Sequence, residues 1–168
     1  MRIAVVTVSD RASRGEYEDR SGPEFERLLS ESLPEAAIDR EIVSDDEPEI
    51  RAALDRAASA GADWIVTCGG TGPSPRDRAP EATRDWIDRE LPGLAEALRA
   101  ASLVETPYAV FSRGLAGMRG KTFVVNLPGS PAAARLGARF LAPLLEHGAS
   151  MARGGGHEGC GDPKAAKG

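Results

Sequence analysis

The feature that most constrains the fold is an alternation of short, β-rich runs with segments of helical periodicity. The runs at 3–8, 64–68 and 121–126 are rich in Val, Ile and Phe, as expected of strands buried on both faces. The segments 37–43 and 108–111 are further, weaker strand candidates. Strands that alternate with helices in this way predict an α/β fold with a largely parallel sheet.

Start signals place the expected helices between these strands, at Ser21, Asp46, Pro80, Pro92 and Ser130. Ser21 with Glu24 has the spacing of a capping box, and Asp46 is expected to cap the helix that follows it. Ser130, followed by proline, has the pattern of a cap and first helical position. Pro143 inside that last helix predicts a kink or an early end.

The length, composition and charge of the chain limit the kinds of function that it can have. The chain has 168 residues, which predicts one domain (1–150), and the Gly-rich polar segment 151–168 predicts a disordered tail. A net charge of -5 argues against nucleic acid as a partner. No apolar run approaches the roughly 18 residues of a membrane span, so no membrane association is expected. The two cysteines lie far apart and no secretory signal opens the chain, which favours a cytoplasmic protein.

Three loops follow the ends of expected strands: 9–11, 69–72 and 126–131. In a parallel sheet these loops meet at the carboxyl edge, where α/β proteins bind ligands. The Gly-Gly-Thr-Gly loop at 69–72 offers bare backbone N–H groups to a phosphate, although the same glycines also suit a sharp turn. Ser130 can cap its helix while the remaining N–H groups of that helix end bind an anion.

Two carboxylates accompany these loops. Asp45 follows the second expected strand, and Asp77 lies in the loop after the glycines. Carboxylates that converge on a phosphate site suggest Mg²⁺, which takes one or two carboxylates together with substrate phosphates. Spacing alone leaves open that Asp45 merely caps a helix, and that Arg76 either contacts a phosphate or is solvated.

Taken together, the motifs resemble those of the Mog/MoaB-type molybdenum cofactor biosynthesis family. The blocks that carry the resemblance stand in the family's order over about residues 1 to 150, namely Val8–Ser13, Asp19–Pro23, Thr67–Pro73 with Arg76–Asp77 and Pro80–Thr83, Glu90–Gly93 and Asn126–Pro131. Each block alone is modest, and their combination is specific.

The resemblance implies a three-layer α/β/α sandwich around a mostly parallel sheet, and Mg²⁺-dependent adenylylation of molybdopterin by ATP. Asp45 and Asp77 match the family's catalytic carboxylates and would hold the metal. The loops and the resemblance together predict that nucleotide or pterin is bound by Ser9, Asp10, Gly69, Gly70, Thr71, Gly72, Ser112, Gly129, Ser130 and Pro131. Which loop holds which substrate stays open.

The same resemblance implies a homotrimer and, as a partner, a molybdenum-insertion enzyme. It also leaves an alternative: a non-catalytic MoaB-type protein that binds molybdopterin and passes it on. A flavodoxin-like flavin binder is a second alternative, which the scarcity of aromatic residues in the candidate loops disfavours.

Overall fold

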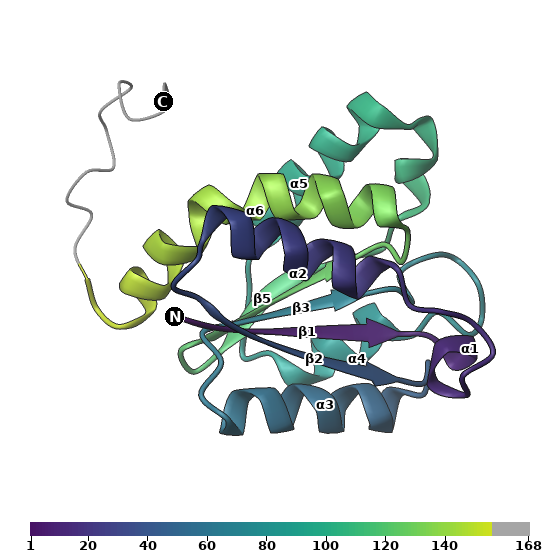
Figure 1. Cartoon of the computed structure of the whole chain (residues 1–168), viewed down its shortest axis with the longest axis horizontal. Helices are drawn as coiled ribbons and strands as arrows, with labels where there is room; N and C mark the ends of the chain where they lie inside the picture. The colour runs from purple at the N-terminus through teal and green to yellow at the C-terminus, as the bar shows by residue number, and fades with distance from the viewer. Residues whose placement is uncertain (156–168) are drawn as a thin grey trace.

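The computed structural model describes residues 1–155, which form a six-stranded sheet covered by helices on both faces (Figure 1). The strand order is β2-β1-β3-β6-β5-β4. The parallel part consists of β2 (Ala37–Val43), β1 (Arg2–Val8), β3 (Trp64–Cys68) and β6 (Thr122–Leu127). The antiparallel edge consists of β5 (Ala116–Arg119) and β4 (Arg89–Glu90).

The helices complete a three-layer α/β/α sandwich, as predicted. On one face lie α2 (Ser21–Ser32), α5 (Pro92–Glu105) and α6 (Pro131–Ala152), which bury residues such as Phe25, Leu98 and Leu141 against the sheet. On the other face lie α3 (Glu47–Ser59) and α4 (Ala79–Trp86), which contribute Ile50 and Trp86 to a second core. Figure 1 shows α2 and α6 above the strands and α3 below them. No helix within residues 1–155 is long and apolar enough to cross a membrane.

Two helix caps differ from the prediction. Helix α2 begins at Ser21 but its N-terminus is capped by Asp19, whose Oδ1 accepts hydrogen bonds from the Ser21 and Gly22 N–H groups at 3.0 and 3.1 Å. The predicted capping box at Ser21 is therefore wrong, because a carboxylate two residues earlier already satisfies these donors. Asp46 does occupy the N-cap position of α3, but its side chain bonds Ser44 and Arg76 instead of the helix backbone.

The segment predicted as a strand at 108–111 is wrong. Residues Pro107–Phe111 form a short 3-10 helix, η1, which starts where Thr106 Oγ1 accepts a hydrogen bond from the Tyr108 N–H. Val110 and Phe111 are 60% and 59% exposed, so this apolar segment does not enter the sheet.

Two antiparallel strands were not predicted. β5 pairs with β6 across a two-residue turn at Gly120 and Lys121, and Gly120 takes a φ of 57°, as a tight hairpin requires. β4 is only two residues long and pairs with β5. Neither strand is rich in β-branched residues, which explains why composition alone did not reveal them.

Helix α6 continues through Pro143 to Ala152, so of the kink or early end predicted at this proline the early end does not occur. Tertiary packing holds the second half: Leu145 is fully buried, and its carbonyl accepts a hydrogen bond from Trp64 Nε1 at 2.9 Å. A Cβ at Gly148 would lie 2.6 Å from the Trp64 ring, so the helix packs closely on β3. The predicted tail begins within this helix, and its residues 156–168 lie outside the described residues.

One buried amide side chain joins β6 to β3, to α4 and to the residue just before β5. Asn126 in β6 is 2% exposed, and its Nδ2 donates to Thr67 Oγ1 and Thr83 Oγ1, both at 2.9 Å. Its Oδ1 accepts from the Leu115 N–H at 3.2 Å. Every polar atom of this side chain is therefore satisfied inside the core, where an unpaired donor or acceptor is costly.

We predict that Asn126→Leu lowers the free energy of unfolding by about 2–3 kcal/mol, because it leaves the Leu115 N–H without its partner and the two threonine hydroxyls without their donor. Urea denaturation measures the change. As a control, Thr67→Val should lower the free energy of unfolding by less in the Asn126→Leu background than in the natural chain. Equal costs in the two backgrounds would contradict the assigned network.

Candidate active site

The strand order creates a crevice at one edge of the sheet. The chain leaves β1 toward β2 on one side, and it leaves β3 toward the β6-β5-β4 side on the other. α/β proteins bind ligands at such a switch point. A cavity of about 1000 Å³ opens there. All of the predicted binding positions line it, namely Ser9, Asp10, Asp45, Gly69, Gly70, Thr71, Gly72, Asp77, Ser112, Gly129, Ser130 and Pro131. The predicted meeting of the three loops is confirmed, and the role of each residue stays a prediction.

The glycine loop begins where β3 ends. Gly69 has a φ of 117° and Gly70 a φ of 61°, conformations that side chains rarely allow. A Cβ at Gly69 would lie 2.2 Å from the Val8 carbonyl oxygen, so the loop passes directly against the end of β1. The Gly69 N–H donates to the Leu127 carbonyl at 2.9 Å, which joins the loop to the end of β6. The glycine cluster is therefore a sharp turn that lines the cavity, and its role in binding a phosphate stays a prediction.

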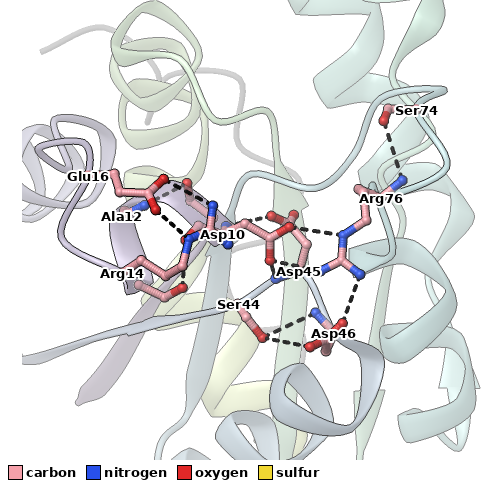
Figure 2. Close-up of polar contacts among 11 residues, drawn as sticks. Asp10, Ala12, Arg14, Glu16, Ser44, Asp45, Asp46, Ser74 and Arg76 are labelled. Carbon is pink, nitrogen blue, oxygen red and sulfur yellow. Dashed lines mark hydrogen bonds and ion pairs between the residues drawn. The ribbon is translucent and has the colours of Figure 1, made fainter.

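Asp10 and Asp45 form a reciprocal pair between the ends of β1 and β2 (Figure 2). The Asp10 N–H donates to Asp45 Oδ2 at 2.7 Å, and the Asp45 N–H donates to Asp10 Oδ1 at 3.1 Å. Asp45 thus does not cap α3. Burial raises the pKa of the Asp45 carboxyl above its ordinary value, the Asp10 N–H opposes that shift, and the charges of Asp10 and Asp77 add to it.

Asp77 approaches the cavity from the loop that leads into α4. Its Oδ2 accepts a hydrogen bond from the Ser74 N–H at 3.0 Å, and a Cβ at Gly72 would lie 2.9 Å from that oxygen. Within residues 1–155, no donor binds Oδ1 of Asp45 or of Asp77. Each carboxylate therefore has one oxygen available, which fits a Mg²⁺ ion that takes its other ligands from phosphates and water. No group of three or more His, Cys, Asp or Glu side chains with metal-binding geometry occurs in the described part of the chain.

Two arginines hold the Asp77 loop. Arg76 does not line the cavity, and its guanidinium binds Asp10 and Asp46 (Figure 2). The hydrogen bonds from Arg76 hold the pKa of the Asp10 carboxyl below its usual value. From the other side, Arg113 donates to the Gly72 carbonyl at 2.8 Å and to the Asp77 carbonyl at 2.6 Å.

The N-terminus of α6 forms another wall of the cavity. Ser130 caps this helix by accepting a hydrogen bond from the Ala133 N–H at 3.1 Å, so the predicted cap is confirmed. Pro131, Ala132 and Ala133 also line the cavity. The N–H groups of a helix's first turn and the helix dipole favour an anion at this position.

Several cavity residues were not predicted as site residues. Asp19 and Thr7 face the cavity and share a hydrogen bond of 2.7 Å. The aromatic residues Tyr17, Tyr108 and Phe111 lie at exposed positions around the cavity. The sequence could have indicated Asp19, because it belongs to the Asp19–Pro23 block. The aromatic residues could not be found in this way, because they lie outside the three loops expected at strand ends.

The family follows from comparison with known proteins. A family model described as "Probable molybdopterin binding domain" matches residues 4–147. The chain belongs to this family.

Relatives and solved structures agree with that assignment. The molybdopterin adenylyltransferase of Helicobacter pylori strain J99 is 42% identical over 137 residues, which are 80% of this chain and 78% of the relative. The molybdopterin biosynthesis enzyme MoaB of Thermus thermophilus is 46% identical, with a TM-score of 0.82 over 91% of this chain and 96% of that one. The Mog protein of Mycobacterium ulcerans is 38% identical, with a TM-score of 0.82 over 90% and 98% of the two chains.

We predict that Gly69→Ala lowers the free energy of unfolding by about 2–4 kcal/mol, because it combines a positive φ with a backbone clash at Val8. Thermal and urea unfolding measure the loss. Gly93→Ala in α5 is the matched control, since a Cβ there meets nothing within 4 Å, and it should leave stability unchanged or slightly raised. Similar losses in both variants would show that the Gly69 geometry is not needed.

Proposed function

We propose that this chain is a molybdopterin adenylyltransferase and that residues 1–150 carry the reaction. A phosphate oxygen of molybdopterin forms a bond to the α-phosphorus of ATP, the bond between the α- and β-phosphates breaks, and pyrophosphate leaves. The observation that carries the proposal is one cavity at the switch point that gathers two carboxylates, a glycine loop and a helix N-terminus. The relatives named molybdopterin adenylyltransferase support it with identities of 36–42%.

The proposed chemistry is mainly positioning and charge neutralisation, as in phosphoryl transfer generally. Asp45 and Asp77 would each offer one carboxylate oxygen to Mg²⁺. When bound, the metal neutralises the charge on the ATP phosphates. Burial, together with the charges of Asp10 and Asp77, raises the pKa of the Asp45 carboxyl, so a bound cation would favour its ionised form.

The remaining cavity positions are assigned to the phosphates of the two substrates. The glycine loop (69–72) brings backbone N–H groups into the cavity without side chains in the way, and Thr71 adds a hydroxyl. Gly129 and Ser130, at the start of α6, place the helix N-terminus beside this loop. Ser9, Asp10 and Ser112 line the same space and are proposed to contact substrate, with the division between nucleotide and pterin not assigned.

We predict that Asp77→Asn and Asp45→Asn lower the turnover number at least 100-fold while the chain stays folded, because each removes a charged ligand of the proposed metal. The purified chain is mixed with molybdopterin, ATP and Mg²⁺, and adenylylated molybdopterin and pyrophosphate are quantified. Asp39→Asn is the control, since this exposed β2 residue lies outside the cavity.

The outcomes of this assay separate the candidate functions. Product that requires Mg²⁺ and both aspartates supports the adenylyltransferase. Tight molybdopterin binding without product in the natural chain would instead favour a binding protein of the MoaB type. Full activity in Asp77→Asn would remove the role assigned to that carboxylate.

We further propose that the chain assembles as a homotrimer and that a molybdenum-insertion enzyme receives its product. The exposed apolar side chains at the end of α5 and in η1 support an assembly surface: Val104 is 88% exposed, Tyr108 76% and Val110 60%. Apolar residues gathered in this way are typical of interaction sites.

We predict a solution mass about three times 17.7 kDa for the natural chain, measured by light scattering. Val104→Asp should lower this mass, because burying an unpaired carboxylate in an interface is costly. Ser59→Asp, at an exposed position of α3 on the opposite face of the sheet, should leave it unchanged. A monomeric natural chain would refute the trimer.

A further inference from the structure

A single side chain joins the two segments that carry the proposed metal ligands. Arg76 directly precedes Asp77, yet its guanidinium reaches back to the segment of Asp45 (Figure 2). Nε and Nη2 donate to Asp10 at 2.9 and 2.8 Å, and Nη1 donates to Asp46 at 2.9 Å. Asp10 is the hydrogen-bonding partner of Asp45, and Asp46 is its neighbour in sequence.

These contacts also decide which carboxylate is available. Both oxygens of Asp10 are occupied, Oδ2 by Arg76 and Oδ1 by Arg76 together with the Asp45 N–H. Asp45, in contrast, uses only Oδ2, in the bond from the Asp10 N–H. Arg76 therefore neutralises Asp10 and, within residues 1–155, leaves one oxygen of Asp45 without a donor in the cavity that Asp77 also lines.

We propose that Arg76 is a positioning residue: it fixes the spacing of Asp45 and Asp77 so that one divalent cation can bind between them and the phosphates of ATP. The inference rests on the proposed function, because it concerns the same two carboxylates. Arg76 does not line the cavity, so it acts on the substrates only through the aspartates that it holds.

A second arginine in the same loop provides a matched control. Arg78 pairs with Glu47 and so joins the same two segments, but neither residue lines the cavity or contacts Asp10 or Asp45. The two arginine side chains are similarly exposed, at 56% and 43%. Exposed ion pairs contribute little to stability, so Arg76→Gln and Arg78→Gln should both fold and melt close to the natural chain.

The test measures divalent cation binding directly. Titration calorimetry with Mg²⁺, and paramagnetic resonance with Mn²⁺, are done on the full chain in the presence of a non-hydrolysable ATP analogue, with Asp45→Asn as the reference for a lost ligand. Arg76→Gln should weaken cation affinity by roughly tenfold or more, the size of effect seen when a residue that orients a metal ligand is removed. Arg78→Gln should stay within about twofold of the natural chain, as expected of an exposed ion pair.

Turnover then distinguishes positioning from general damage. In Arg76→Gln the Mg²⁺ concentration for half-maximal rate should rise by roughly tenfold, while the rate at saturating Mg²⁺ falls less. Arg76→Lys keeps the charge but loses the planar guanidinium that spans Asp10 and Asp46. Its Mg²⁺ concentration for half-maximal rate should therefore lie between those of the natural chain and Arg76→Gln.

The outcomes against the proposal are distinct from failure of the proposed function. Equal cation affinity in Arg76→Gln and Arg78→Gln would overturn the positioning role, as would a natural chain that binds no cation with the analogue. A natural chain that binds Mg²⁺ with this dependence on Arg76, yet forms no adenylylated product, would refute the adenylyltransferase and leave the role of Arg76 in place.

Discussion

The site depends on the close approach of three strand ends at Gly69. Its Cα lies where a side chain would collide with the Val8 carbonyl of β1, and its N–H binds the Leu127 carbonyl of β6. From the third side, a Cβ at Gly129 would lie 3.1 Å from the Gly69 Cα. With the loops packed this tightly, the N-terminus of α6, the glycine loop and the end of β1 face one cavity. A larger residue at position 69 would separate the elements that the proposed reaction needs together.

The electrostatics of the cavity explain why a cation belongs in the proposed mechanism. The chain carries a net charge of -5, and its proposed substrates are polyanions. Arg76 and Arg113, the arginines of the central loops, are bound to carboxylates and carbonyls of the protein. Their charge holds the loops in place. Arg11, Arg14 and Arg20 also line the cavity, and in the proposed mechanism a metal at Asp45 and Asp77 would add to them and to the backbone N–H groups in neutralising the phosphates. Preorganised groups of this kind need not rearrange when charge develops in the transition state.

The antiparallel edge of the sheet serves the site indirectly. The β5–β6 hairpin places the 112–115 connection beside the glycine loop, where the Arg113 N–H donates to the Thr71 carbonyl at 2.9 Å. Arg99 in α5 holds the same connection from outside, through the carbonyls of Ser112 and Gly114. Ser112 thus enters the cavity on a segment fixed from two directions, although nothing in its local sequence marks it as part of a strand-end loop.

The sequence by itself determined the architecture and the location of the site. Buried strands and amphipathic helices are visible in local periodicity, and parallel strand ends must share an edge, so 9–11, 69–72 and 126–131 were expected to meet. Tertiary structure alone decided which side chains are paired: Asp45 with the Asp10 backbone rather than with its own helix, and Arg76 between two aspartates. The same holds for β4 and β5, which are short and lack β-branched residues. These features arise from contacts between distant segments, which no local pattern encodes.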